Sequence, residues 1–388
     1  MSGADEETRQ ARAALARIAE PGDEVLGRWV TALGPVETWR ALREGDGPPA
    51  GASPDRWAGM RLRAGNTSPE ADLARIARLG GRFVCPEDRE WPRQLDDLGP
   101  GQPVGLWVRG PCSLRFVALR SVALVGARAC TDYGAHVAAE LATALGDRGW
   151  TVVSGAAYGI DGAAHRGALT TGGSTIAVLA CGVDVSYPAA HRELLGRIAE
   201  RGLLVAELAP GDHPTRWRFI QRNRVIAALT RGTVVVEAAR RSGSLVTARH
   251  ASRLGRHLMA VPGPVTSGLS AGTHRLIREE ATLVGDAADI IELAGDMGDL
   301  AAPEAAPVVP RDLLAPQVGE VLDALPATAP ATVEEVARGA CTSLAAAGAR
   351  LRELTSLGFV ERVGDRWQLC RAGPRHAGPA DVSGDVPA

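Results

Sequence analysis

The sequence predicts an α/β protein built on a Rossmann-like doubly wound parallel sheet. Between residues 121 and 294, apolar runs of strand length alternate with helix-type stretches, and the strand-type runs are VALVG, WTVVSG, STIAVLA, LLVAEL, GTVVVEA and HLMAVPG. This βαβ repetition implies parallel strands with helices on both faces, because right-handed crossovers carry successive helices over the sheet. Ligands of such sheets bind at the C-terminal ends of the strands, so the turns after the strands are the candidate site.

Flanking segments complete the expected domain organisation. Apolar residues at helical spacing predict a small helical domain in residues 1–80. Residues 81–295 form the expected Rossmann-like domain, which begins with an extended lead-in. An Ala- and Pro-rich linker at 296–316 precedes a winged-helix-like domain at 317–371, read as three helices and two short strands. Residues 372–388, rich in Gly, Pro and Asp, are expected to be disordered.

Composition excludes several classes of function. All 43 residues counted as Lys+Arg are arginines. A P-loop ATPase needs a lysine for the nucleotide phosphates, and Schiff-base catalysis needs a lysine amine, so both classes are excluded. No apolar run approaches the ~20 residues that span a bilayer. The polar, acidic N-terminus MSGADEETRQ lacks the features of a secretory signal, so we expect a cytoplasmic protein without membrane contact.

The six cysteines lie far apart, and no C-x-x-C pair is present. The sequence therefore predicts neither a zinc site nor a redox centre, and the thiols are expected to be reduced and mostly buried. No metal and no cofactor are expected.

A strongly basic segment extends from Pro214 to Arg256. It contains ten arginines and one acidic residue, Glu237, so its net charge is +9 although the whole chain carries −2. An arginine run is usually a solvated helix face, but the acidic residues that balance such a face are missing here. This imbalance favours a polyanionic ligand.

Part of this segment is expected at the ligand edge of the sheet. One group, Arg216, Arg222 and Arg224, surrounds the start of a predicted helix. The other, Arg240 and Arg241 with the Ser242-Gly243-Ser244 turn, follows the next strand. The candidates are Arg216, Arg222, Asn223, Arg224, Ser242, Gly243 and Ser244. The planar guanidinium holds phosphate oxygens in two hydrogen bonds, and Asn223 can add a directional contact. Aromatic residues make up only 4%, so phosphate capture should dominate binding and make it sensitive to salt.

Two glycine-containing turns follow the first two strands of the repetition. Gly126-Ala127-Arg128 stands where a dinucleotide-binding enzyme would show G-x-G-x-x-G, so that fingerprint is absent. Arg128 can bind a phosphate from this turn, or it can be a surface residue of a tight turn. The turn that begins Ser154-Gly155 offers backbone amides and a helix N-terminus to an anion. Within it, Asp161 is explained equally well as a ligand-binding residue or as a cap of the following helix. His165 is explained equally well as a ligand-binding residue or as a side chain that faces that helix.

Six ordered motifs between residues 122 and 277 resemble the DNA-processing protein A family, also called Smf. They are VGARACTDYG, SGAAYGIDGAAH, GVDVSYP, RFIQRNRVIAAL, VVVEAARRSGSLVTARHA and MAVPGPVTSGLSAGTHRLI. The PEDREWPRQLDDL and GLWVRG segments are similar to the family's lead-in. The resemblance also implies that the helical domain in residues 1–80 is of the SAM or helix-hairpin-helix type. The chain departs from the family at Ile220, where proline is frequent, and at His191, where asparagine is common. It also lacks the lysines that make some of the family's phosphate contacts.

This resemblance implies a protein that binds single-stranded DNA and helps to load the RecA recombinase during natural transformation or related recombination. It also implies displacement of, or cooperation with, single-strand-binding protein, a homodimeric state, and no bond chemistry. Carried over by motif and combined with the two turns, the expected DNA-binding residues are Arg128, Ser154, Gly155, Arg216, Arg222, Asn223, Arg224, Ser242, Gly243 and Ser244.

Two other classes of function remain as alternatives. Glu207 and Glu237 each follow a predicted strand and could serve a nucleotide hydrolase similar to the phosphoribohydrolases that release cytokinin-type bases. That family's P-G-G-x-G-T-x-x-E turn is absent, however. A transcriptional regulator would need a basic recognition helix, whereas the third helix of the winged-helix-like domain carries only Arg350 and Arg352 opposite Glu353.

Overall fold

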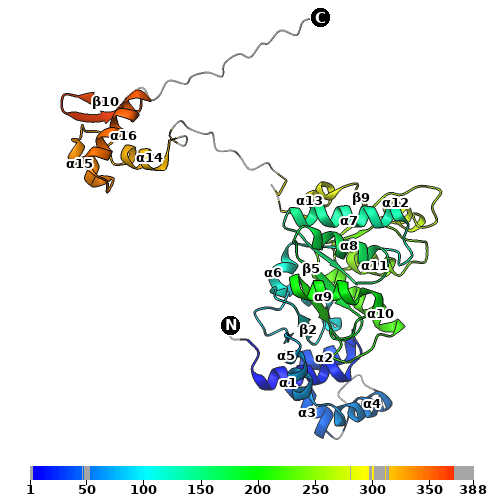
Figure 1. The fold of residues 1–388 in the computed structure, drawn as a ribbon. Coiled ribbons are helices and arrows are strands. Elements are labelled where there is room, and N and C mark those ends of the chain that lie inside the picture. Colours follow the sequence, from blue (N-terminus) through cyan, green and yellow to red (C-terminus); the bar gives the residue numbers. More distant parts are fainter. Residues whose placement is uncertain are drawn as a thin grey trace, which may run out of the picture. The chain divides into compact units, whose positions relative to one another are not determined.

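The computed structural model describes residues 3–45, 47, 53–279, 281–296, 299–300, 311 and 314–370. Contacts divide the chain into two compact units, Met1–Leu300 and Ala301–Ala388 (Figure 1). Most of the expected linker and all of the expected tail lie outside the described residues. Within the described part of the chain, no helix is long and apolar enough to cross a membrane.

A nine-stranded sheet with the order β1-β2-β6-β5-β4-β3-β7-β8-β9 organises the first unit. Its strands are β1 (Gly81–Val84), β2 (Leu106–Arg109), β3 (Ser121–Val125), β4 (Thr151–Ser154), β5 (Thr175–Leu179), β6 (Leu203–Ala206), β7 (Gly232–Val235), β8 (His257–Ala260) and β9 (Thr282–Leu283). The seven strands from β6 to β9 in this order are mutually parallel. The central strands are continuous apolar runs because both faces of the sheet are covered.

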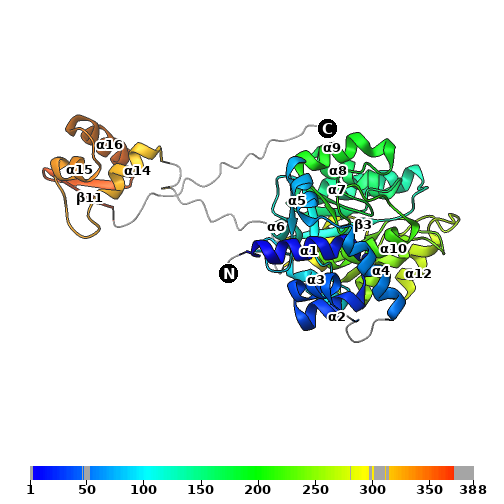
Figure 2. The same cartoon turned by 90° about the horizontal axis from the view of Figure 1, so that it is seen from below.

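Helices cover both faces, which confirms the doubly wound α/β prediction. The helices that follow the strands are α6 (Leu114–Leu119), α7 (Asp132–Asp147), α8 (Ile160–Thr170), α9 (Arg192–Arg201), α10 (Arg216–Leu229), α11 (Ser244–Arg253), α12 (Ala271–Glu279) and α13 (Ala287–Ala294). One apolar core joins the sheet to α7, α8 and α13, and another joins it to α6, α10 and α11. Figure 2 shows α7 to α9 on one side of β3 and α10 and α12 on the other.

The strand order reverses next to β3, and this reversal positions the site. The chain proceeds from β3 outward through β4, β5 and β6, and then returns to place β7 on the other side of β3. The connections after β3 and β7 therefore leave the sheet in opposite directions. A crevice opens between such connections at the C-terminal ends of the strands, and it is the usual ligand site of open α/β sheets.

The expected extended lead-in is part of the sheet itself. Strands β1 and β2 pair with each other antiparallel, and β2 pairs antiparallel with β6. Between them lies the 3₁₀ segment η1 (Arg93–Gly101), and after them lies the short helix α6. A helix of six residues is too short to show a 3.6-residue period, so the sequence analysis missed α6.

Among the residues that the structure describes, five helices precede the sheet. They are α1 (Glu6–Ile18), α2 (Glu24–Leu33), α3 (Pro35–Glu44), α4 (Pro54–Gly65) and α5 (Pro69–Arg78). Ala13 of α1 and Ile76 of α5 pack into one core with Phe83 and Trp107 of the antiparallel strands. Helices α1 and α5 therefore share an apolar core with the sheet, whereas α2, α3 and α4 pack with α1 in a core of their own.

The second unit has its own core. It consists of α14 (Pro316–Asp323), α15 (Val333–Gly339), α16 (Leu344–Ser356), β10 (Val360–Val363) and β11 (Arg366–Leu369). Val336, Leu351, Leu354 and Trp367 are among its buried residues. The order of three helices and a hairpin is the order expected from the sequence, and the winged-helix interpretation of it stays a prediction.

Candidate nucleic-acid interface

A groove of about 1010 Å³ lies at the point where the strand order reverses. Its walls are the turn after β3, the turn after β7, and the first two turns of α10. Seven of its lining residues are arginines, namely Arg128, Arg216, Arg222, Arg240, Arg241, Arg249 and Arg275. Asp161 is the only carboxylate that lines it among the described residues. The groove is therefore strongly cationic, although the chain as a whole is slightly acidic.

Few internal acids compensate these arginines. Among the described residues, Arg275 alone of the seven forms an ion pair, with Glu279 at 3.6 Å. The other six have no carboxylate within 4 Å there. Excess positive charge in a concave site concentrates the field and attracts anions, so the groove suits a ligand with several negative charges.

The fold divides nine of the ten arginines of the basic segment into two sets, and Arg253 belongs to neither of them. Four of them form ion pairs with acidic residues far away in the sequence, in the pairs Arg218–Glu20, Arg224–Glu207, Arg231–Asp296 and Arg256–Asp97. Five line the groove, namely Arg216, Arg222, Arg240, Arg241 and Arg249. Within the segment, Glu237 is the only acid that could balance these arginines, and the acids that pair with the first set lie outside the segment. Tertiary contacts supply them for the first set and not for the second.

Arg224 was expected in the pocket, and the structure places it elsewhere. Residues advance by ~100° each around an α-helix, so side chains two positions apart diverge by ~200°. Arg222 therefore lies at the groove, whereas Arg224 lies away from it. The Arg224 guanidinium donates to both oxygens of Glu207, at 2.8 and 2.6 Å. Both side chains are nearly buried, with 6% and 11% exposure.

Arg222 forms the floor of the groove and is held from below. Its side chain is buried, and Nη1 donates to the carbonyl oxygen of Val178 at 2.5 Å. Burial lowers the pKa of Arg222 to about 10, and the negative charge of Asp161 opposes this shift. Arg222 therefore keeps its positive charge at neutral pH, at a fixed position.

The turn from Ser154 to Asp161 does not present its amides to a ligand as the sequence analysis expected. The amides of Gly155 and Ala157 donate to Oδ2 of Asp161, at 3.1 and 3.4 Å. Ser154 is buried and donates to the carbonyl oxygen of Leu124. An internal carboxylate thus occupies the position foreseen for an external anion. Burial raises the pKa of Asp161, and the nearby charge of Arg222 and the two amides partly offset that rise.

His165 has a structural environment. It is fully buried on α8, and its Nδ1 lies 2.8 Å from the Thr175 hydroxyl oxygen. Burial lowers its pKa to about 3, so the imidazole is neutral at physiological pH. This geometry favours a structural role for His165, whose side chain packs within the fold, over a role in ligand binding.

Gly155 is required by the position of Arg222. A Cβ at residue 155 would lie 1.9 Å from Nη1 of Arg222. We expect Gly155→Ala to displace the Arg222 guanidinium and to destabilise the fold by about 1–3 kcal/mol, because the added methyl group overpacks the site. Affinity for a DNA strand should fall at least about tenfold, because one charge-assisted hydrogen bond to the ligand is lost. Anisotropy with a labelled dT strand and urea unfolding measure the two effects.

Gly196 offers the control for that substitution. It is exposed on α9 and does not line the groove, and an added Cβ would meet nothing within 4 Å. Gly196→Ala is expected to leave affinity unchanged and not to lower stability, because alanine is favoured over glycine inside a helix. Equal affinity of the two variants for the dT strand would show that Gly155 has no part in positioning Arg222.

An aromatic pair forms part of the groove wall. The rings of Tyr187 and Phe219 lie 5.4 Å apart, and the guanidinium of Arg128 lies 4.8 Å from the centre of the Phe219 ring. Such an arrangement holds Arg128 through a cation–π contact. It also provides ring faces against which a flat, unpaired base can stack.

The turn after β7 closes the groove on its other side. The hydroxyl oxygens of Ser242 and Ser244 lie 2.7 Å apart, and the Ser244 amide donates to the Ser242 hydroxyl oxygen. Asn223 of α10 donates from Nδ2 to the Gly243 carbonyl oxygen at 3.4 Å. Asn223 thus links the two walls. Helix α11 begins at Ser244, so its N-terminus is directed toward the anion-attracting region.

Both candidate acids of the hydrolase alternative have structural partners. Glu207 is paired with Arg224, as described above. Glu237 is buried, and it accepts hydrogen bonds from the Thr131 amide at 2.9 Å and the Thr131 hydroxyl at 2.6 Å. These contacts hold the N-terminal end of α7 against the segment that follows β7. Neither carboxylate lines the groove.

Seven of the ten expected site residues meet at the groove, since Ser154, Gly155 and Arg224 do not line it. Arg240 and Arg241, which the sequence placed beside the Ser242–Ser244 turn at the ligand edge, line the groove as well. The structure adds Arg249, which lies within the basic segment, and Arg275. Arg275 follows that segment and joins the groove only through the fold.

Comparisons with known proteins agree with this geometry. A family model described as DNA recombination-mediator protein A matches residues 82–295, more than half of the chain. The putative DNA processing protein DprA of Mycobacterium tuberculosis is 44% identical over 387 residues, which cover 97% of both chains. The chain belongs to the DNA recombination-mediator protein A family. This confirms the family that the motifs resembled.

Relatives from this family extend the agreement to a solved structure. The DNA processing protein DprA of Streptococcus pneumoniae is 38% identical over 237 residues, which cover 59% of this chain and 83% of that one. The X-ray structure of the S. pneumoniae protein covers 76% of this chain and 100% of its own, with a TM-score of 0.62 and 30% identity. The Rossmann-like sheet is thus common to both.

Proposed function

We propose that this protein binds single-stranded DNA without sequence preference in the groove beside β3 and β7, and that it helps to load RecA recombinase on that DNA. The observation that carries the proposal is the excess of groove arginines that lack internal acids. A row of guanidinium forks holds phosphate oxygens whatever the bases are. The family description as a DNA recombination mediator supports the same class of ligand.

Single-stranded rather than duplex DNA is favoured by the aromatic wall. Phe219 and Tyr187 lie among the arginines, and stacking on a side-chain ring requires a base that is free of its partner. Unpaired strands are flexible enough to place both phosphates and bases in one groove. The proposed site residues are accordingly Arg128, Arg216, Arg222, Asn223, Ser242, Gly243 and Ser244, together with Arg240, Arg241, Arg249 and Arg275.

The proposed action requires partners and no bond chemistry. RecA, single-strand-binding protein and a second copy of this chain are the partners we propose, in the cytoplasm and during natural transformation or related recombination. The engagement of Glu207 by Arg224 and of Glu237 by Thr131 supports a binding role over hydrolysis. A groove that holds a strand without cleaving it would serve to transfer that strand to a recombinase.

Titration of a fluorescent dT strand at two salt concentrations tests the proposal. Release of counterions from about five contacted phosphates gives a slope of roughly −3.5 in log K against log salt, so affinity should fall about 100-fold between 50 and 200 mM salt. Arg128→Ala combined with Arg216→Ala and Arg241→Ala should abolish most binding, because all three side chains are exposed in the groove.

Arg197→Ala with Arg192→Ala is the control for lost surface charge, since both are exposed on α9 and do not line the groove. This control should bind as the wild type does. If the wild-type protein fails to bind dT at low salt, the proposed function is wrong, and nucleotide hydrolysis becomes the next activity to assay.

A further inference from the structure

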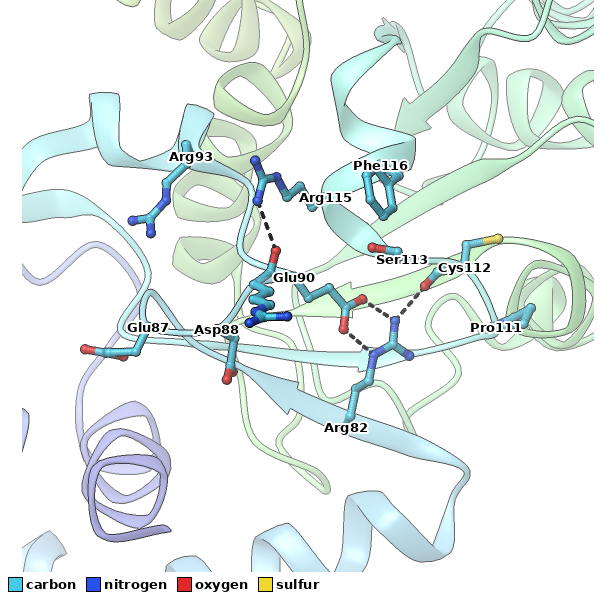
Figure 3. A pocket seen from close by; sticks show the side chains of 11 residues that line it. Arg82, Glu87, Asp88, Glu90, Arg93, Pro111, Cys112, Ser113, Arg115 and Phe116 are labelled. Carbon is cyan, nitrogen blue, oxygen red and sulfur yellow. Dashed lines mark hydrogen bonds and ion pairs between the residues drawn. The ribbon is translucent and has the colours of Figure 1, made fainter. Parts of the chain in front are cut away.

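A second cavity, of about 710 Å³, lies beside the short helix α6. Figure 3 shows its walls: Arg82 of β1, the loop from Glu87 to Arg93, and the segment from Pro111 to Phe116. The cavity lies at the opposite edge of the sheet from the DNA groove. Arg109 at the end of β2 pairs with Leu204 at the start of β6, so the residues after β2 lie at the N-terminal ends of the parallel strands.

Every carboxylate that lines this cavity is paired with an arginine. Glu90 accepts from Arg82, with Nε and Oε2 2.7 Å apart. Asp88 is paired with Arg9 at 2.9 Å, and Glu87 with Arg12 at 2.6 Å. The acidic side chains of the walls are thus neutralised by the fold and leave no net negative charge to repel an anion.

Positive charge remains at the opening. Arg93 and Arg115 are exposed there. Among the described residues, Arg115 has no carboxylate partner, and its Nη1 donates only weakly, to the Arg89 carbonyl oxygen at 3.4 Å. Arg93 forms one exposed pair, 3.6 Å from Asp96, and pairs of that kind are worth ~0–1 kcal/mol. The cavity therefore retains capacity to bind carboxylates.

Apolar surface lies next to these arginines. Phe116 is 72% exposed, and Leu119, one helical turn further along α6, is 45% exposed. The opposite side of the helix is buried through Leu114 and Ala118. Phe116 and Leu119 thus place apolar surface beside the arginines, and exposed aromatic side chains next to arginines are the residue types that contribute most to the binding energy of protein interfaces.

We propose that this cavity docks an acidic peptide segment of a partner protein, with carboxylates on Arg93 and Arg115 and an apolar side chain against Phe116. Charge complementarity and the adjoining apolar surface both support this occupant. A nucleic-acid strand fits less well, because its evenly spaced phosphates need a continuous basic track. Here the arginines form one compact cluster that alternates with carboxylates. The proposal does not depend on DNA binding in the groove.

Fluorescence anisotropy of the full chain with a labelled peptide, Asp-Asp-Glu-Asp-Leu-Phe, tests the proposal. The wild type should bind it, and two control peptides should bind at least about tenfold more weakly. The first replaces the acidic residues with Asn and Gln, and the second replaces Leu-Phe with Gly-Gly. Arg115→Ala with Phe116→Ser should weaken binding of the original peptide by a similar factor, whereas Arg197→Ala should not.

The same samples distinguish this site from the DNA groove. The Arg115→Ala and Phe116→Ser variant should bind the dT strand as the wild type does, and saturating dT should not displace the peptide. Absence of peptide binding, or equal binding of the double variant, would overturn the proposal. If the Gly-Gly peptide binds as well as the original peptide, the cavity binds anions alone. If dT displaces the peptide, the cavity is a nucleic-acid contact. Either result contradicts the docking of a segment that is both acidic and apolar.

Discussion

Arg224→Met is expected to lower the free energy of unfolding by about 3–5 kcal/mol, because it leaves the Glu207 carboxylate buried without its partner. The two side chains share two hydrogen bonds and are almost excluded from water. Affinity for the dT strand should nevertheless stay within about twofold, since Arg224 does not line the groove. Urea unfolding and anisotropy of the folded variant measure the two quantities.

A double variant, Arg224→Met with Glu207→Leu, separates the loss of a pair from the exposure of a lone charge. Removal of both charges should restore much of the stability, because an apolar pair of similar volume needs no desolvation of ions. The interpretation fails if Arg224→Met keeps full stability but loses DNA affinity, for Arg224 would then be a DNA ligand, as its sequence context suggested.

Asp161→Ala is expected to be the second severe change, with a loss of about 3–5 kcal/mol in the free energy of unfolding. It removes the acceptor for the buried amide of Gly155 and the partly buried amide of Ala157, and it also removes the negative charge that stabilises buried Arg222. Because Arg222 is then held less firmly, affinity for the dT strand should fall as well.

Asp161→Asn is the informative comparison. The carbonyl oxygen of the asparagine can still accept hydrogen bonds from the two amides, but the negative charge is absent. Most of the stability lost in Asp161→Ala should therefore return, while the loss of affinity remains. Both variants can be followed by urea unfolding and dT anisotropy. If Asp161→Ala unfolds at the wild-type urea concentration, the buried carboxylate is not what organises this turn.

The sequence alone determined the fold class, and it indicated the region in which the cationic groove lies. Continuous apolar strands alternating with helices required a parallel sheet covered on both faces, and the sheet places the ends of its strands at one edge. The excess of arginine between Pro214 and Arg256 was visible without coordinates. So were the turns at Arg128 and at Ser242–Ser244, because a strand followed by small residues marks the ligand edge.

Only the tertiary structure decided which charges remain available to a ligand. Sequence neighbours could not reveal that Glu207 neutralises Arg224, or that Asp161 accepts a hydrogen bond from the Gly155 amide. The physical reason is that net charge and free hydrogen-bonding groups depend on distances in space, whereas composition counts them along the chain. Helical geometry alone separates Arg222 from Arg224 by ~200°, but which of the two faces the groove is set by the packing of α10 on the sheet.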